Sequence, residues 1–233
     1  MIKKFTLLFC TTLAWQVSYA DVEQVKTKLK SQYPQLSIEN LQPTESSSLY
    51  SGTLNNQIIY VDEDAQHLFY GSMFRIKDQK NLTQDLMLQQ HAVDFKKLPL
   101  QDAIKTVRGN GKHQLAIFSD PNCPYCKTLE SNLAKLNDVT IYTFMYPIKT
   151  QSVEPSKKVW CSANKEYAWK ALIQRAEQPK VTSDCAHPID RNLQLGQQLK
   201  LQGTPVIIFE NGFKLTGAYP AEDIKTIWKE FNL

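Results

Sequence analysis

Residues 119–127 have the sequence SDPNCPYCK, with two cysteines separated by two residues. The apolar run Leu115–Phe118 precedes this stretch, and leucines at helical spacing follow it, which predicts a strand, a turn and a helix over 126–136. The first turn of a helix has unpaired N–H groups and a partial positive charge, and both stabilise a thiolate. The pattern therefore predicts Cys123 as an attacking nucleophile and Cys126, one turn into the helix, as the resolving thiol of a redox-active Cys123–Cys126 pair.

Two other interpretations of the CxxC stretch are a zinc site and a static disulfide. Zinc needs further ligands, and the chain has no second CxxC; Cys185 and His187 would contribute only if they lay close by in space. A disulfide closing so short a loop is strained and usually labile. We therefore expect thiol–disulfide exchange, with no metal and no cofactor.

A second signal lies about eighty residues further on. Gly203-Thr204-Pro205 directly precedes the apolar run Val206–Phe209. A proline just before a buried strand indicates a turn or a cis bond. The combination with a CxxC helix favours a cis-proline loop at Thr204 and Pro205 over an ordinary loop proline.

The chain from about Leu98 has an α/β pattern. Further strands are expected at 139–146, 206–209 and 214–217, and the last two are joined by a tight turn at Asn211-Gly212. Apolar spacing predicts helices over 156–177, 191–201 and a closing helix that includes Ile224 and Phe231. The fold class expected for 98–233 is α/β with a helical insertion.

The region 21–80 predicts a separate, small α+β unit. A helix over 21–33 is followed by short strands at 49–54, 58–61 and 67–76. A unit of about sixty residues buries little core alone, so pairing with a second copy would stabilise it. A mostly polar linker helix is expected over 81–97, between this unit and the α/β domain.

The first twenty residues are typical of an export signal. Lys3 and Lys4 precede an apolar stretch, and Ser18-Tyr19-Ala20 is a small-x-small cleavage site. A buried first helix and a lipid anchor on Cys10 are the disfavoured alternatives. Cleavage would leave four cysteines in an oxidising compartment, where an even number predicts disulfides. Of three possible connectivities, the spacing favours 123–126 with 161–185.

Charge and hydropathy exclude several classes of protein. The formal net charge is +4, and loss of Lys3 and Lys4 would leave +2 with both signs scattered along the chain. No basic stripe of the kind that binds nucleic acid is present. No apolar run reaches the eighteen or so residues of a membrane span. We therefore expect neither a nucleic-acid binder nor a membrane-spanning protein.

The stretches FSDPNCPYCK (118–127) and QGTPVIIF (202–209), together with Cys161 and Cys185, resemble the DsbC/DsbG family of thioredoxin-fold disulfide isomerases. The resemblance covers nearly all of 21–233. It implies that Pro205 is cis and that Thr204 and Pro205, with Pro124 and Tyr125, contact the client. It also implies that Cys161–Cys185 is a structural disulfide.

The same resemblance implies how the protein works in the cell. Residues 21–80 would be a dimerisation domain, and two catalytic domains would face a shared cleft for unfolded or misoxidised exported proteins. The location would be the periplasm, with an inner-membrane electron donor of the DsbD type and with chaperone activity as a secondary property.

Two positions depart from the family pattern. Pro124-Tyr125 replaces the Gly-Tyr that is common in DsbC members and matches DsbG, so DsbG-like reduction of sulfenylated cysteines stays open. Ile117 occupies the place of the buried acid of thioredoxins, which predicts slow resolution by Cys126 and a long-lived mixed disulfide. A holdase with incidental cysteines and a DsbA-like oxidase are the remaining alternatives, and the N-terminal unit argues against the oxidase.

Overall fold

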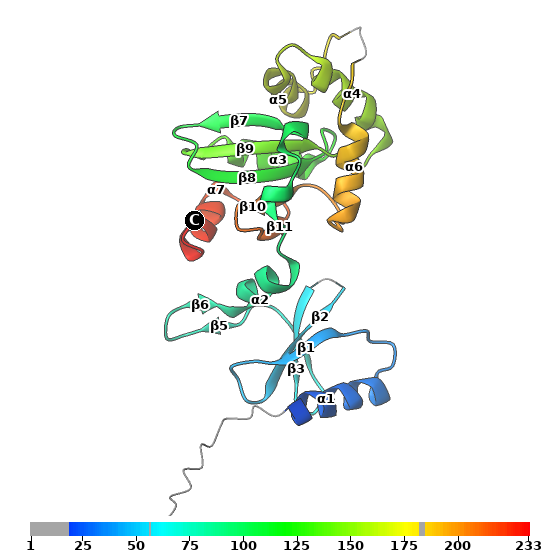
Figure 1. Cartoon of the computed structure of the whole chain (residues 1–233), viewed down its shortest axis with the longest axis vertical. Helices are drawn as coiled ribbons and strands as arrows, with labels where there is room; N and C mark the ends of the chain where they lie inside the picture. The colour runs from blue at the N-terminus through cyan, green and yellow to red at the C-terminus, as the bar shows by residue number, and fades with distance from the viewer. Residues whose placement is uncertain (1–18, 56, 182–184) are drawn as a thin grey trace, which may run out of the picture. The chain divides into compact units, whose positions relative to one another are not determined.

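The computed structural model describes residues 19–55, 57–181 and 185–233 (Figure 1). The expected signal segment 1–20 lies outside these residues except for its last two. The described chain divides into two compact units, one reaching Phe74 and including 81–83, the other formed by 75–80 and 84–233. Every helix in the described chain is too short or too polar to cross a bilayer.

The first unit packs one helix against an antiparallel sheet of order β1-β2-β3-β4. Its elements are α1 (Tyr19–Gln32), β1 (Glu39–Pro43), β2 (Leu49–Leu54), β3 (Gln57–Asp62) and β4 (Leu68–Tyr70). The apolar face of α1 buries Val22, Val25 and Leu29 against the sheet residues Ile59 and Val61. The expected helix and the strands at 49–54 and 58–61 are thereby confirmed.

The single strand expected over 67–76 is wrong. β4 ends at Tyr70, and β5 (Phe74–Arg75) belongs to a separate hairpin with β6 (Lys80–Asn81). Between them the backbone of Met73 bonds to the start of the next helix: its N–H donates to Thr83 Oγ1 at 2.8 Å and its carbonyl accepts from the N–H of Leu82 at 2.9 Å. These bonds replace the ladder that would have continued β4.

The linker helix is shorter than expected. α2 runs over Leu82–His91, and a separate 3-10 helix, η1 (Phe95–Lys97), follows it. The N–H of Val93 donates to the carbonyl of Gly212 at 3.0 Å, and Asp94 caps η1, so that Phe95 is buried. The prediction of a continuous helix to residue 97 is therefore wrong, because the backbone leaves the helix and Val93 bonds to Gly212 of the second unit.

The second unit has a five-stranded sheet of order β11-β10-β8-β9-β7, in which β8 and β9 are parallel and the other pairs antiparallel. Its strands are β7 (Ile104–Arg108), β8 (His113–Ser119), β9 (Val139–Met145), β10 (Val206–Phe209) and β11 (Lys214–Thr216). Its helices are η2 (Leu100–Asp102), α3 (Pro124–Leu133), α4 (Thr150–Cys161), α5 (Lys165–Arg175), α6 (Ile189–Gln198) and α7 (Ala221–Glu230).

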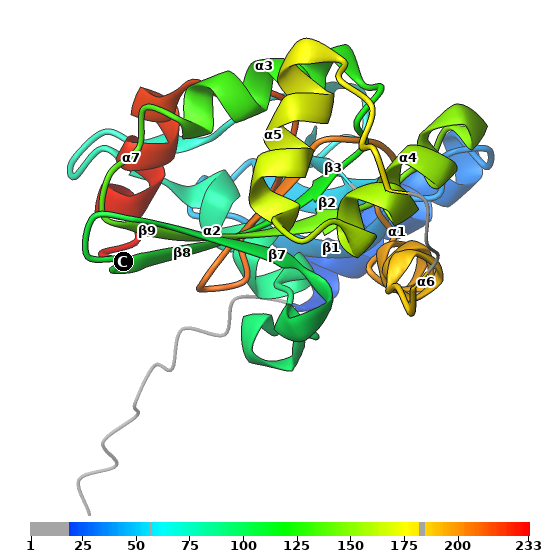
Figure 2. The same cartoon turned by 90° about the horizontal axis from the view of Figure 1, so that it is seen from above.

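The sheet of the second unit is buried on both faces. Along β8, Leu115 and Ile117 pack with residues of α3 and α7, whereas Ala116 and Phe118 pack with Phe95 and its neighbours on the other face. Figure 2 shows α3, α5 and α7 on one side of β7, β8 and β9. The alternation explains why β8 is a continuous apolar run, and it confirms the α/β class expected for this part of the chain.

One further element differs from expectation, and one turn agrees with it. The helix predicted over 156–177 is two helices, because the backbone breaks after Cys161 and Asn164 caps α5 by accepting the N–H of Tyr167 at 2.9 Å. The turn at 211–212 is present as predicted. Gly212 has φ +87°, and a Cβ there would lie 2.3 Å from the carbonyl oxygen of Val93, so only glycine fits.

Candidate active site

Cys123 lies where β8 ends and α3 begins. It is the N-cap residue of α3, and Pro124 occupies the first helical position. The Thr204–Pro205 peptide bond is cis. The loop that contains it approaches the cysteine closely enough for the Cys123 thiol to donate to the Thr204 carbonyl at 3.3 Å. The structure thus brings together the two sequence stretches that were singled out eighty residues apart.

The pKa of the Cys123 thiol is lowered from its ordinary value of 9.0. Burial alone would raise it, but hydrogen bonds with the Thr204 side chain, the backbone and thiol of Cys126, and the backbone of Tyr125 outweigh burial. The last two backbone groups are free N–H groups in the first turn of α3. A larger fraction of Cys123 is therefore thiolate at neutral pH than in an ordinary peptide.

Cys126 has the opposite character. It is 1% exposed, against 8% for Cys123. Burial raises its pKa to about 12, although hydrogen bonds with Ser119, Asp120 and Thr204 act in the other direction. Both cysteines are thiols in the structure. The pKa is thus lowered at the sulfur at the helix N-terminus and raised at the sulfur one turn further on.

A buried carboxylate holds the reactive loop in place. Asp120 is 0% exposed. One of its oxygens accepts from Ser152 Oγ at 2.6 Å and from the N–H of Asn122 at 2.8 Å, and the other accepts from the N–H of Lys149 at 3.0 Å. The Asp120 carbonyl also accepts from the N–H of Cys123 at 3.1 Å. Asp120 therefore ties the cysteine loop to the start of α4.

A small cavity of about 220 Å³ opens beside Cys123. Its walls include Pro121, Pro124 and the apolar side chains of Leu172 and Ile173 on α5. Tyr125 projects from the same loop with 66% of its surface exposed. Asn122, Lys127 and Gln178 also line the cavity. The surroundings of the Cys123 sulfur on this side are thus a mixture of apolar and polar groups.

Cys161 and Cys185 form a disulfide with a sequence separation of 24. The bond joins the end of α4 to the segment before α6. The neighbouring side chains Val159 and Ile189 pack in one cluster with Cys123 and Cys126. The pairing that the spacing favoured is present, and it fastens the helical insertion beside the reactive cysteines.

Both units of the chain match known protein families. Residues 100–232 match the thioredoxin-like domain model, and residues 16–84 match the disulfide bond isomerase protein N-terminal domain model. A probable thiol:disulfide interchange protein DsbC of Bordetella avium is 33% identical over 204 residues, which is 87% of this chain and 73% of the relative. The chain belongs to the DsbC family.

Two further similar proteins show the extent of the likeness. The probable DsbC of Bordetella pertussis is 33% identical over 76% of this chain, but the match spans only 63% of that relative's length. The crystal structure of a disulfide interchange protein from Neisseria gonorrhoeae aligns with a TM-score of 0.54 at 37% identity, covering 57% of this chain and 97% of that one. The thioredoxin-like fold expected for the C-terminal part is confirmed.

Two groups at this DsbC-family site were not identified from sequence. Asp120 is one; its partners Ser152 and Lys149 are about thirty residues away, and no local pattern indicates them. The other is Glu130, one turn after Cys126 on α3, which accepts from Trp169 Nε1 at 3.3 Å. Burial raises the pKa of Glu130. Ile117, which is 1% exposed, occupies the place of the buried acid of thioredoxins. Glu130 is a buried acid at a different position.

Alkylation of the two thiols is expected to separate them by pH. Because the thiolate forms as pH rises through the pKa, iodoacetamide labelling of Cys123 should reach half its maximum rate below pH 9.0, whereas Cys126 should stay unlabelled up to about pH 10. Thr204→Val should move the Cys123 midpoint upward, and Thr204→Ser should restore it. Labelling followed by mass spectrometry measures both sites, and a Cys123 midpoint at or above 9.0 contradicts the assignment.

Loss of the disulfide is expected to destabilise the second unit. The bond closes a loop of roughly 25 residues, which the chain-entropy model values at about 3 kcal/mol. Urea unfolding of the Cys161→Ala/Cys185→Ala variant should therefore show a free energy of unfolding lower by about that amount. Dithiothreitol should lower the stability of the parent chain similarly and leave the variant unchanged; equal stability of parent and variant in the oxidised state would contradict the expectation.

Proposed function

We propose that the chain is a protein disulfide isomerase and reductase that rearranges incorrect disulfides in exported proteins. The observation that carries the proposal is the lowered pKa of Cys123 at a helix N-terminus beside the Thr204–Pro205 loop. Membership of the DsbC family supports thiol–disulfide interchange as the reaction. Cys123 is the proposed nucleophile, Cys126 the resolving thiol, and no bound cofactor takes part.

The proposed reaction begins with attack by the Cys123 thiolate on one sulfur of a client disulfide. A bond forms between Cys123 Sγ and that sulfur, and the other client sulfur leaves as a thiolate. In isomerisation, a different client thiolate attacks the client sulfur of the mixed disulfide and releases Cys123 as a thiolate. No net electrons are transferred, so Cys123 is regenerated without a reductant.

Reduction follows the second route of the same intermediate. Cys126 loses its proton and attacks Cys123 Sγ, which releases the client sulfur as a thiolate and leaves a Cys123–Cys126 disulfide. The protein has then donated two electrons, so a reductant must restore the dithiol. We propose an inner-membrane donor of the DsbD type for this step. The high pKa of Cys126 makes this route slow and favours isomerisation.

The proposed client contacts surround Cys123. Thr204 and Pro205 would hold an extended client segment by main-chain pairing, while Pro124 and the exposed Tyr125 would contact its side chains. The cavity walled by Leu172 and Ile173 would take an apolar residue next to the client cysteine. These contacts are few and depend little on the client's sequence, which suits clients that share only an exposed cysteine.

We propose that the first unit mediates a homodimer. β4 is the last strand in the order β1-β2-β3-β4, and Phe69, Tyr70 and Phe74 are 49%, 63% and 55% exposed. An unpaired strand with exposed aromatic side chains pairs readily with a second copy. In sedimentation, the parent chain should behave as a dimer and a Phe69→Glu/Tyr70→Glu variant as a monomer; a monomeric parent chain would remove this part of the proposal.

Turnover of a scrambled multi-disulfide protein tests the proposed function. With a catalytic amount of the reduced chain, native activity of the client should return faster than with glutathione alone. A parallel assay on a sulfenylated single-cysteine client tests the DsbG-like alternative, which the Pro124-Tyr125 pair favours. Suppression of aggregation without any recovery of native disulfides would instead favour a holdase.

We propose the periplasm as the location, because the reaction requires clients that form disulfides.

A further inference from the structure

A cavity of about 830 Å³ lies in the second unit at the start of β8. Its lining comes from β8 and the residue before it, the α3–β9 connection, α7 and the chain's last residues. The members used below are Lys112, His113, Lys135, Lys225, Trp228 and Lys229. His113 and Ser119 are six positions apart along β8, which is about 20 Å along a strand. The cavity is therefore at the opposite end of β8 from the cysteines and is not explained by their chemistry.

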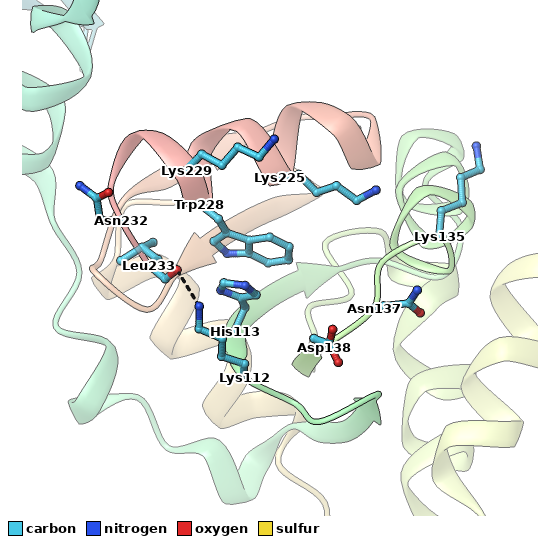
Figure 3. A pocket seen from close by; sticks show the side chains of 10 residues that line it. All are labelled: Lys112, His113, Lys135, Asn137, Asp138, Lys225, Trp228, Lys229, Asn232 and Leu233. Atoms are coloured by element: carbon cyan, nitrogen blue, oxygen red, sulfur yellow. Dashed lines mark hydrogen bonds between the residues drawn. The ribbon is translucent and has the colours of Figure 1, made fainter.

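An aromatic pair forms part of the cavity lining. The imidazole of His113 stacks on the indole of Trp228, with ring centroids 4.3 Å apart and planes inclined by 13°. Figure 3 shows the two rings one above the other between α7 and the start of β8. Within the described chain, His113 Nδ1 and Trp228 Nε1 are buried and have no hydrogen-bond partner, although Glu210 Oε1 lies 3.9 Å from His113 Nδ1. An indole N–H is a donor only, so Trp228 Nε1 lacks an acceptor.

Positive charge surrounds the aromatic pair. Lys225 and Lys229 lie one turn apart on α7, Lys112 directly precedes His113, and Lys135 follows α3; Figure 3 labels all four side chains around the rings. Among the described residues, Lys135 and Lys229 have no ion pair. Lys225 pairs with Glu222 at 2.8 Å, and Glu222 is 80% exposed, so that contact is weak in water.

Fewer carboxyl groups than ammonium groups lie at the cavity. Asp138 Oδ1 accepts from the N–H of Asn110 at 3.0 Å, an oxygen of Leu233 lies 3.5 Å from Lys112 Nζ, and Glu210 Oε1 lies 3.9 Å from His113 Nδ1. The four ammonium groups thus outnumber the carboxyl groups of Asp138, Glu210 and Leu233. An excess of positive charge with unpaired donors in a concave site is suited to an anion that has several acceptor oxygens.

We propose that this cavity, formed by Lys112, Lys135, Lys225 and Lys229 around the stacked His113 and Trp228, binds a small multivalent oxyanion, whether phosphate or carboxylate. The lysines supply the charge, and the anion supplies the acceptors that the lining lacks. A volume of about 830 Å³ is within the usual range for small-ligand sites. Occupancy of this end of β8 leaves the cysteines accessible, so binding is independent of the proposed disulfide exchange.

Titration with inorganic pyrophosphate and with citrate, at constant ionic strength, tests the proposal on the chain from residue 21. Isothermal calorimetry should show saturable 1:1 binding of at least one anion, and the better of the two identifies the oxyanion class. The nitrogen–proton resonance of the Trp228 indole, assigned with Trp228→Phe, should shift with the same saturation. Equivalent sodium chloride should not reproduce the shift.

Matched variants decide whether the cavity is the site. Lys135→Gln/Lys229→Gln should weaken binding at least tenfold, because two of the four ammonium groups are removed. Lys30→Gln/Lys96→Gln removes two exposed lysines outside the cavity and should leave binding within twofold of the parent. No saturable binding at 10 mM of either anion, equal loss in both variants, or binding without movement of the Trp228 resonance would each overturn the proposal. Alkylation of Cys123 should be the same with and without the anion.

Discussion

Cys123→Ser is expected to abolish exchange on a scrambled client, while Cys126→Ser should keep part of the isomerase activity. Serine at 123 cannot form a mixed disulfide, so no later step can occur. Serine at 126 leaves the first attack intact, and a client thiol can still complete the rearrangement. Exchange activity of Cys123→Ser should fall below detection, and reduction of the client should disappear in both variants.

Trapping of the intermediate gives this prediction a second measurement. Cys126→Ser should accumulate a covalent adduct with the client, visible on a non-reducing gel and absent from Cys123→Ser. The Cys161→Ala/Cys185→Ala variant is the matched control for loss of sulfur elsewhere, and it should form no excess adduct. Full activity in Cys123→Ser, or a client adduct through Cys126 in that variant, would contradict the assigned roles.

Asp120→Ala is expected to lower the free energy of unfolding by about 3–5 kcal/mol and to weaken catalysis. The carboxylate accepts three hydrogen bonds in a fully buried position. Its removal leaves the buried Ser152 hydroxyl without its acceptor, at about 1–3 kcal/mol. The part-buried N–H groups of Asn122 and Lys149 lose hydrogen bonds to a charged group, which adds a smaller cost because water can replace them. The loop that carries Cys123 then loses its connection to α4.

Urea unfolding with both disulfide states fixed measures the effect of Asp120→Ala. Ser152→Ala removes a single donor and should cost about 1–2 kcal/mol, while Asp223→Ala, at an exposed position in α7, should cost less than about 1 kcal/mol. The alkylation midpoint of Cys123 should also rise in Asp120→Ala if the loop shifts away from Thr204. If Asp120→Ala changed the free energy of unfolding no more than Asp223→Ala does, the hydrogen bonds of Asp120 would not stabilise the loop that carries Cys123.

Local patterns identified the reactive part of the molecule because its information is local. The CxxC stretch sits between an apolar strand and a helix with leucines on one face, and Thr204-Pro205 directly precedes β10. These features depend on neighbours within about ten residues. They predicted that Cys123 is at a helix N-terminus and that Cys126 is the more shielded of the two, with 1% exposed against 8%; the roles of the two sulfurs stay predictions.

Tertiary contacts decided what the sequence did not predict. β1 and β7 were not identified, since neither has a long apolar run and each is defined by its pairing with β2 or β9. The helix expected to continue to residue 97 ends because Val93 bonds to Gly212, more than a hundred residues away. Asp120 was quoted as part of the motif, but its function as an anchor depends on Ser152 and Lys149. Such pairings have no signature within a single stretch of chain.

The contact between Cys123 and Thr204 spans 81 residues of sequence. In the unfolded chain, the sulfur of Cys123 has no Thr204 beside it and has the acidity of an ordinary thiol. The lowered pKa of Cys123 is therefore acquired only when the chain folds. Folding thus precedes thiolate formation, which limits cross-linking between chains that are still unfolded.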